Sequence, residues 1–179
     1  MATEVKIFPV QQCIIDNVRS IRVELGITSE ELSRHVSPSG STTLIGNIES
    51  TKSIATYTDE ILNAIAVAFT DASKENGSIK EYTLFDFYPK KPVSDIPQIK
   101  VKLDILDSFG PTGTLNAILE TKDFFDYPRT IREITDYCNS FHDRNWKSNN
   151  ITSTLEFFVK KGKLKKLEDN DGGVKYQKS

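Results

Sequence analysis

The chain has 179 residues, a net charge of −2 and a hydrophobic fraction of 37%, values typical of a globular protein with one domain or two small ones. No apolar run approaches the roughly 18 residues that a membrane span requires. The first residues lack the basic and apolar regions of a secretory signal, so we expect a cytoplasmic protein. Cys13 and Cys138 are too few for a disulfide framework and are expected to be buried thiols.

Charge is sorted along the sequence. Residues 1–73 carry five basic and nine acidic side chains, a net charge of −4. Residues 74–143 carry nine and twelve, a net charge of −3, whereas residues 144–179 carry nine and four, a net charge of +5. The lysines of this last segment alternate with a helical pattern and a hairpin pattern, which is not typical of a solvated tail. A basic, folded C-terminal segment indicates an anionic partner.

Five short helices are predicted in the first 73 residues. Apolar residues recur at helical spacing from Val10 to Leu25, and Gly26 ends that helix. Thr28 and Glu31 form a capping box, in which each side chain bonds the other residue's backbone N–H, and this begins a second helix. Three further helices are predicted, one beginning near Ser41 and the others over residues 53–57 and 59–69.

This first segment contains the run VRSIRVELGITSEELSRHV followed by STTLIGNIES. Over roughly residues 10–70 it resembles the λ-repressor/XRE helix-turn-helix family. In that family the helix that begins here at Ser41 would be the recognition helix in the major groove. The resemblance implies that five polar residues face DNA: Ser29, Ser41, Thr42, Thr43 and Asn47. Because the domain is acidic and this helix lacks Lys and Arg, a role in pairing with another protein stays open as an alternative.

Residues 74–111 are predicted to form a linker. Its prolines prevent a continuous helix, and aromatic residues such as Phe87 and Tyr88 are available to hold it against a core. Alternation of apolar and charged residues predicts a strand over residues 99–106. Two partners for this strand are open: the C-terminal hairpin, or the same strand of a second chain, which would make a homodimer.

A second domain is predicted over residues 112–179. It begins with a helix, and the aromatic residues at 124–127 suggest a short extended piece after it. Thr130 and Glu133 form another capping box, which begins a second helix. Residues 141–146 are then expected to connect that helix to the next one.

The last helix and a hairpin complete this domain. Small polar residues at 148–150 favour a helix start, and Ile151, Leu155 and Phe158 have the spacing of one buried helical face. A glycine ends the helix, and the turn-rich residues 169–173 join two basic strands.

Over about residues 112–178, this order of elements resembles a winged helix-turn-helix. The resemblance makes the helix after Trp146 the recognition helix and the hairpin the wing. The implied DNA contacts come from both elements: Lys147, Ser148, Asn149, Thr152, Ser153, Lys163, Lys165, Lys166 and Lys175. Serine, threonine and asparagine side chains can bond base edges or phosphates, and lysines release counterions from the phosphate backbone.

Catalysis has little support in the sequence. His35 and His142 have no metal-ligand companions at usable spacing, and we interpret Cys138 near His142 as a core thiol near a connector residue. Nucleotide-binding and hydrolase motifs are absent. We therefore expect neither an enzyme nor a cofactor, metal site or small-molecule ligand.

The predicted fold class is mainly α. A λ-repressor-like five-helix domain is joined, by a proline-containing linker with a short strand, to a winged-helix domain of α+β type. The predicted function is sequence-specific binding of double-stranded DNA by a bacterial or mobile-element transcriptional regulator, with no membrane partner. The alternative is a protein–protein adaptor that uses its helix-turn-helix folds for assembly.

Overall fold

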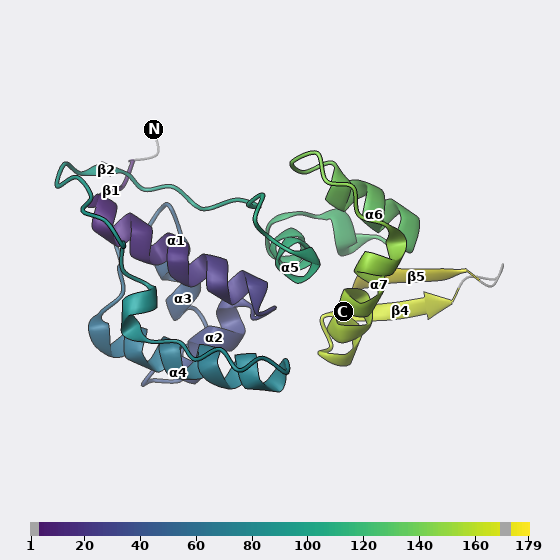
Figure 1. Ribbon diagram of the computed structural model, residues 1–179, viewed down its shortest axis with the longest axis horizontal. Helices are drawn as coiled ribbons and strands as arrows, with labels where there is room; N and C mark the ends of the chain where they lie inside the picture. The colour runs from purple at the N-terminus through teal and green to yellow at the C-terminus, as the bar shows by residue number, and fades with distance from the viewer. Residues whose placement is uncertain (1–3, 169–172) are drawn as a thin grey trace. The chain divides into compact units, whose positions relative to one another are not determined.

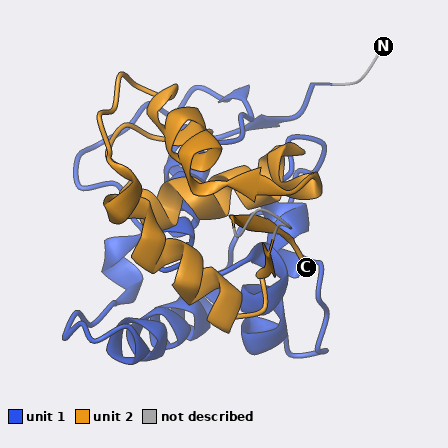
Figure 2. Ribbon diagram, turned by 90° about the vertical axis from the view of Figure 1, so that its right-hand side faces the viewer, with its two compact units in different colours: residues 1–103 blue, residues 104–179 orange. Residues whose placement is uncertain are grey.

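The structure is a computed structural model that describes residues 4–168 and 173–179 (Figure 1). Within these residues, seven α-helices make up roughly half of the chain, and the strands form two small antiparallel sheets. The chain divides into two compact units, Met1–Leu103 and Asp104–Ser179 (Figure 2). Residues 74–103, which were predicted to belong to a linker, thus lie in the first unit.

The first unit is built on four α-helices: α1 (Pro9–Glu24), α2 (Ser29–Val36), α3 (Leu44–Glu49) and α4 (Asp59–Glu75). The capping box predicted for α2 is confirmed, because the Thr28 hydroxyl accepts from the Glu31 N–H and the Glu31 carboxylate accepts from the Thr28 N–H. Proline at the first position of α1 has the backbone angle that a helix start needs. The helices enclose a core whose fully buried members include Val18, Leu32 and Phe69.

The predicted count of five helices is wrong, since residues 53–57 contain no helix. The carbonyl groups of Ser53 and Ala55 instead accept hydrogen bonds from Lys100 Nζ, at 2.7 and 3.1 Å. Lys100 is buried, and desolvation lowers its pKa from the ordinary lysine value. A cation that binds two carbonyl groups of an irregular segment removes them from helical bonding.

Helix α3 begins at Leu44 and not near Ser41 as predicted. The Ser41 N–H donates to Ser37 Oγ at 3.0 Å, and the Thr43 N–H donates to Ser41 Oγ at 3.3 Å. Side-chain oxygens that accept from nearby backbone N–H groups compete with helix formation. The three residues before Leu44 are therefore not helical.

The strand predicted over residues 99–106 is shorter than expected, and among the described residues it does not pair with the C-terminal hairpin, which was one of its two predicted partners. Strand β2 (Gln98–Ile99) pairs antiparallel with β1 (Lys6–Ile7) inside the first unit. Beyond β2, the side-chain amide of Gln12 on α1 both donates to the Val101 carbonyl at 2.9 Å and accepts from the Val101 N–H at 3.1 Å. A helix side chain thus occupies the backbone groups that a neighbouring strand would have used.

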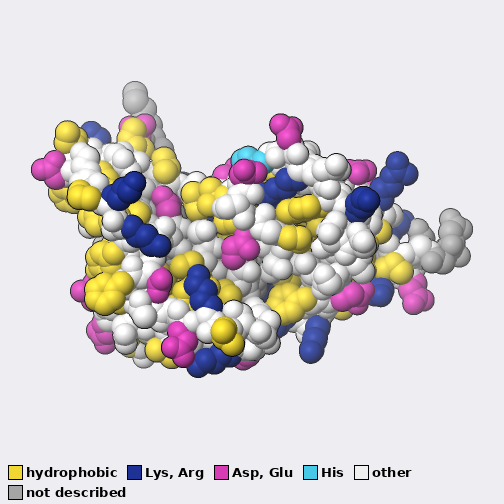
Figure 3. All heavy atoms as spheres, in the orientation of Figure 1, with side chains coloured by type: hydrophobic (Ala, Val, Ile, Leu, Met, Phe, Trp, Pro, Cys, Tyr) yellow, Lys and Arg dark blue, Asp and Glu magenta, His cyan; other side chains and the backbone are white. Residues whose placement is uncertain are grey.

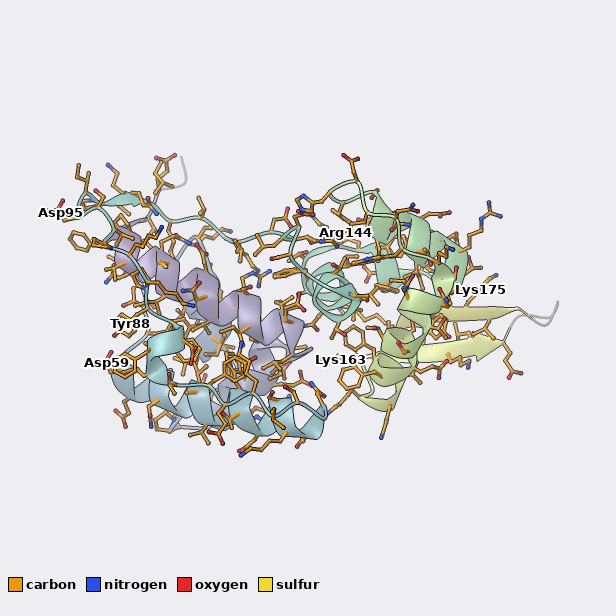
Figure 4. The ribbon with its side chains drawn as sticks, in the orientation of Figure 1. Asp59, Tyr88, Asp95, Arg144, Lys163 and Lys175 are labelled. Atoms are coloured by element: carbon orange, nitrogen blue, oxygen red, sulfur yellow. The ribbon has the colours of Figure 1, made fainter. Side chains whose placement is uncertain are left out.

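Aromatic residues that follow α4 pack back onto that helix. Phe87 is fully buried and, like Tyr82, packs edge-on against Phe69, with ring centroids 5.9 and 5.8 Å away. The Tyr88 hydroxyl donates to Asp59 Oδ1 at 2.6 Å, at the start of α4 (Figure 4). These contacts explain why this part of the chain belongs to the first unit.

The second unit has the element order that the sequence predicted: helix, short strand, helix, helix and hairpin. Its elements are α5 (Pro111–Thr121), β3 (Arg129–Thr130), α6 (Ile131–Asn139), α7 (Ser148–Lys160), β4 (Leu164–Glu168) and β5 (Val174–Lys178). The strands form one antiparallel sheet in the order β3-β5-β4. The turn predicted to join the last two strands lies, apart from Gly173, outside the described residues.

The predicted helical face of α7 is confirmed as a core element. Ile151, Leu155 and Phe158 are completely buried. Leu164 of β4 and Tyr176 of β5 are buried as well, on the sheet beside that helix (Figure 1). Burial of these side chains fixes which face of α7 remains available to solvent.

Candidate nucleic-acid interface

The exposed face of α7 is polar. Lys147 precedes the first turn, and its N–H donates to Asn150 Oδ1 at 2.9 Å, which anchors the start of the helix. Asn149 and Ser153 are exposed and lie four residues apart, on one side of the helix. Their amide and hydroxyl groups form no hydrogen bond among the described residues, so this side of α7 is available to bind a partner.

The connection between α6 and α7 is held by side chains. The Asn139 amide donates to the Trp146 carbonyl at 2.9 Å and accepts from the Trp146 N–H at 2.8 Å. Between them, His142 and Asp143 adopt positive φ angles of 57° and 48°, a conformation that non-glycine residues seldom adopt. The two hydrogen bonds of the Asn139 side chain hold this strained turn in one geometry, and they hold the start of α7 in the same way.

Arg144 fixes the same connection to the start of the unit (Figure 4). Its guanidinium group lies 4.7 Å from the centre of the Trp146 ring and donates to the Thr114 hydroxyl and to the Leu106 carbonyl. The His142 Nε2 atom lies 2.6 Å from the Ile105 carbonyl oxygen. Side chains of the connection therefore bind the backbone at the start of the unit and hold the residues that lead into α7.

Two hairpin lysines lie on one face of the sheet. Lys165 is exposed and pairs across the hairpin with Gln177, and Lys175 pairs with Leu167. Because side chains alternate between the two faces of a strand, Lys165 and Lys175 share a face. Lys175 is half-buried and lies near Glu133, whose pKa is lowered mainly by the Thr130 N–H and further by this lysine.

Lys166 lies on the opposite face and is bound to α7. Its Nζ atom donates to Glu156 Oε1 at 3.0 Å, and the Tyr176 hydroxyl donates to the same oxygen at 3.0 Å. The hydrogen bond from Lys166, followed by that from Tyr176, lowers the pKa of Glu156, and the carboxylate raises the pKa of Lys166. This lysine is a link between hairpin and helix.

Three other predicted contact residues are engaged inside the unit. Lys163 Nζ donates to Asn116 Oδ1 at 3.3 Å (Figure 4). The Thr152 hydroxyl donates to the Ser148 carbonyl at 2.8 Å, and Ser148 Oγ lies 3.4 Å from the hydroxyl of a threonine on α6. The predicted residues that remain exposed in this unit are Lys147, Asn149, Ser153, Lys165 and Lys166, of which Lys166 is bound to Glu156.

The residues predicted from the λ-repressor resemblance lie around α2 and α3. Ser29 is the first residue of α2 and is half-buried. Ser41 is half-buried in the turn before α3, whereas Thr42, Thr43 and Asn47 are exposed. Helix α3 carries no basic residue, and its single carboxylate, Glu49, is buried.

That buried carboxylate belongs to an ion cluster that the sequence reading did not identify. Glu49 Oε2 lies 2.8 Å from Arg19 Nη1 and 2.8 Å from Arg22 Nη2, and all three side chains are at most 3% exposed. Nearby, the Tyr57 hydroxyl is buried without a hydrogen-bond partner among the described residues, and desolvation raises its pKa well above the ordinary tyrosine value. The sequence feature that could have indicated this cluster is the position of two arginines on the apolar face of α1. The side chains of this cluster are buried in the first unit.

Cys138 is completely buried, and desolvation raises its pKa to about 12. The thiol is therefore protonated at neutral pH and is not a nucleophile. Within the described part of the chain, no group of three His, Cys, Asp or Glu side chains is placed to hold a metal ion.

Across the described ranges, no helix is both long enough and apolar enough to cross a membrane. The chain matches no protein-family model, no curated protein and no solved structure.

Proposed function

We propose that the second unit is a winged helix-turn-helix that binds double-stranded DNA. In this proposal α7 enters the major groove and the β4–β5 hairpin is the wing. The order of its elements is that of the winged-helix class, and α7 directly follows the connection from α6. Within that class, the chain is proposed to act as a transcriptional regulator of bacterial or mobile-element origin.

One observation carries this proposal. Asn149 and Ser153 are exposed on the polar face of α7, and the hairpin that follows this helix carries the exposed Lys165. Both lie in residues 144–179, the segment with a net charge of +5. A polar reading surface beside a basic hairpin supplies both base contacts and phosphate contacts.

The roles of the exposed residues follow from their chemistry. The Asn149 amide presents a donor and an acceptor, the pair that recognises the N6 and N7 atoms of adenine. The Ser153 hydroxyl can bond either a base edge or a phosphate. Lys147 and Lys165 are proposed to neutralise phosphates and so provide affinity that does not depend on sequence.

The first unit is proposed to be a λ-repressor-like helix-turn-helix domain with α3 as its recognition helix. Residues 1–73 carry a net charge of −4, which opposes strong binding of phosphates. The acidity of this segment favours the second candidate function, an adaptor in which helix-turn-helix folds contact other proteins. A homodimer is part of the DNA-binding proposal, since two copies would meet two half-sites.

The test is duplex binding by the full-length protein at several salt concentrations, after selection of bound sequences from a random duplex pool. We expect affinity to fall steeply with salt, and Lys165→Ala to flatten the slope of log K against log salt by about 0.9. Lys74→Ala removes an exposed lysine from α4 in the first unit and serves as the matched control. An absence of duplex binding even at low salt would contradict the proposal and favour the adaptor.

A further inference from the structure

Strand β4 forms one edge of the sheet in the second unit. The strand order is β3-β5-β4, so among the described strands β4 pairs with β5 alone. Lys165, Lys166 and Glu168 are exposed on it, and Leu167 is half-buried. Figure 3 shows basic, acidic and hydrophobic side chains close together at the end of the second unit that bears the hairpin. An edge strand presents backbone N–H and carbonyl groups to which a further strand can bind.

The hydrogen-bond pattern of the hairpin identifies which backbone groups face this open edge. The Ser179 N–H donates to the Lys163 carbonyl at 3.2 Å, and these two residues continue the register of β4 and β5 as a bonded pair. Bonded and non-bonded pairs alternate along an antiparallel ladder, so the odd-numbered residues of β4 bond β5 and the even-numbered ones do not. The N–H and carbonyl groups of Lys166 and Glu168 therefore point away from β5.

The order of charges along β4 is self-complementary. A two-fold axis at Leu167 places β4 antiparallel to β4 of a second copy, so that Lys166 of each copy lies opposite Glu168 of the other. Because both residues point their backbone groups into the edge, each of these two pairs can form the two hydrogen bonds of a bonded pair. At the axis, the Leu167 side chains of the two copies meet in a non-bonded pair, the kind in which side chains lie closest.

Every other two-fold axis on this strand is unfavourable. An axis at Lys165, Lys166 or Glu168 places that residue against its own copy, and like charges directly opposite each other destabilise a sheet. An axis at Leu164 places Lys163 against Lys165, with the same result. An axis between two residues pairs a residue that faces the edge with one that already bonds β5. The charges of β4 therefore select one alignment and disfavour the others.

The existing contact of Lys166 is compatible with this pairing. Its Nζ atom donates to Glu156 Oε1 at 3.0 Å, which uses one of the three donors of an ammonium group. Glu168 is two residues from Lys166 and lies on the same face of the strand, so the charged pairs of the two copies would form on one face. Lys166 can bind the second copy and still hold α7.

We infer that the chain forms a two-fold homodimer in which the β4 strands of two copies pair antiparallel about Leu167. The pairing joins two three-stranded sheets into one. The inference names the surface of the homodimer included in the proposed function, and it rests on that proposal only for the use of two copies on two half-sites. Lys165, proposed to contact a phosphate, lies on the other face of the strand from the charged pairs and stays available to DNA.

The experiment is sedimentation of the full-length protein, without DNA, over a range of protein and salt concentrations. We expect a wild-type dimer whose association weakens as salt screens its charged pairs. Lys166→Glu and Glu168→Lys each place like charges opposite each other in both pairs and should weaken self-association at least about tenfold. An equimolar mixture of the two variants should associate again, because each pair then joins a lysine to a carboxylate.

Hydrogen exchange tests the wild type directly and does not depend on the folding of a variant. Exchange of the Lys166 and Glu168 N–H groups should slow as protein concentration rises, whereas that of Leu167, which already bonds β5, should not change. Val101→Lys is the control, because it adds a charge at a position of the first unit that is 54% exposed and lies in the segment predicted from sequence to pair two copies. It should leave the dimer intact.

Four outcomes overturn the inference. They are a wild type that is monomeric at every concentration, single variants that dimerise normally, a mixture that does not associate, and a dimer that Val101→Lys dissociates. Exchange of the Lys166 and Glu168 N–H groups that does not depend on concentration also overturns it. Each of these results leaves the proposed DNA binding standing, because a monomer can still bind a duplex, and duplex binding is measured separately.

Discussion

Glu156 Oε1 lies 3.0 Å from Lys166 Nζ, and this pair joins the middle of α7 to strand β4. The same oxygen accepts from the hydroxyl of Tyr176 on β5, so one carboxylate holds both hairpin strands against the helix. Both side chains of the ion pair are more than 40% exposed, so the pair contributes little to the free energy of unfolding. The effect of the pair is geometric, because it keeps Lys166 at the helix and away from the DNA phosphate that this lysine was predicted to contact.

Replacing Glu156 by glutamine should therefore strengthen duplex binding. The change removes one negative charge beside the proposed interface and releases Lys166. We expect tighter binding of all duplexes, and a salt slope that steepens by about 0.9 if the released lysine gains one phosphate. Asp126→Asn also removes one carboxylate from the second unit, but from a short 3₁₀ segment outside α7 and the hairpin, and it provides the control. Unchanged affinity in Glu156→Gln would mean that Lys166 does not reach DNA when free.

Two substitutions at exposed positions can separate recognition of the DNA sequence from binding that does not depend on sequence. Asn149→Ala should change which sequences are selected from a random pool, at a cost of about 1–3 kcal/mol for a lost base contact. Lys165→Ala should weaken binding to all sequences alike. Thr152→Ala serves as a control on α7, because its hydroxyl already donates to the Ser148 carbonyl. An unaltered sequence preference in Asn149→Ala would exclude this face of α7 as the reader.

The local patterns in the sequence predicted much of the second unit. The buried face of α7 and the capping box of Thr130 and Glu133 depend on residues three to seven positions apart, and both are confirmed. The orientation of the lysine side chains could not be predicted from such local patterns. Lys163 is bound by Asn116, 47 residues away in sequence, and a tertiary contact of this kind leaves no periodic signal.

The same limit explains the error over residues 99–106. Alternating apolar and charged residues do favour an extended chain, and the residues from Gln98 begin as one. The strand ends early because the Gln12 side chain takes up the carbonyl and N–H groups of Val101 that a ladder would need. Which side chain of a distant helix will bond a strand edge cannot be read from the alternation itself.

The buried ion cluster of the first unit should dominate its response to mutation. Glu49→Gln leaves Arg19 and Arg22 without their shared counterion in a buried site. Breaking a buried ion pair in this way costs roughly 3–5 kcal/mol. Glu30→Gln breaks the pair with Arg34, whose side chains are both more than half exposed, and should cost at most about 0.5 kcal/mol.

The two units can be followed separately in this measurement. Trp146 is the one tryptophan of the sequence and lies in the second unit, so its fluorescence follows that unit, while far-ultraviolet circular dichroism follows both. Denaturation of Glu49→Gln should move the circular-dichroism transition of the first unit to lower denaturant and leave the fluorescence transition in place. Equal stability of Glu49→Gln and Glu30→Gln would show that the two arginines are solvated or otherwise compensated.

The boundary between the units predicts which fragment binds DNA. Ile105 and Phe109 are buried in the second unit, and the carbonyl of Leu106 accepts from Arg144, which stacks on Trp146. A fragment of residues 112–179, the domain predicted from sequence, would lack these contacts. We therefore expect residues 104–179 to fold with a higher free energy of unfolding than residues 112–179, by roughly 2–5 kcal/mol for each large buried side chain that is lost.

Residues 104–179 should also keep most of the duplex affinity of the full-length protein at low salt, because the segment with a net charge of +5 lies within them. Residues 1–103 hold eleven basic and thirteen acidic side chains, a net charge of −2, and should bind poorly. Titration of the two fragments with one duplex, alongside circular dichroism of both fragments and Trp146 fluorescence of residues 104–179 as tests of folding, decides the matter. Equal binding by the two folded fragments would place the affinity outside α7 and its hairpin and would contradict the proposed interface.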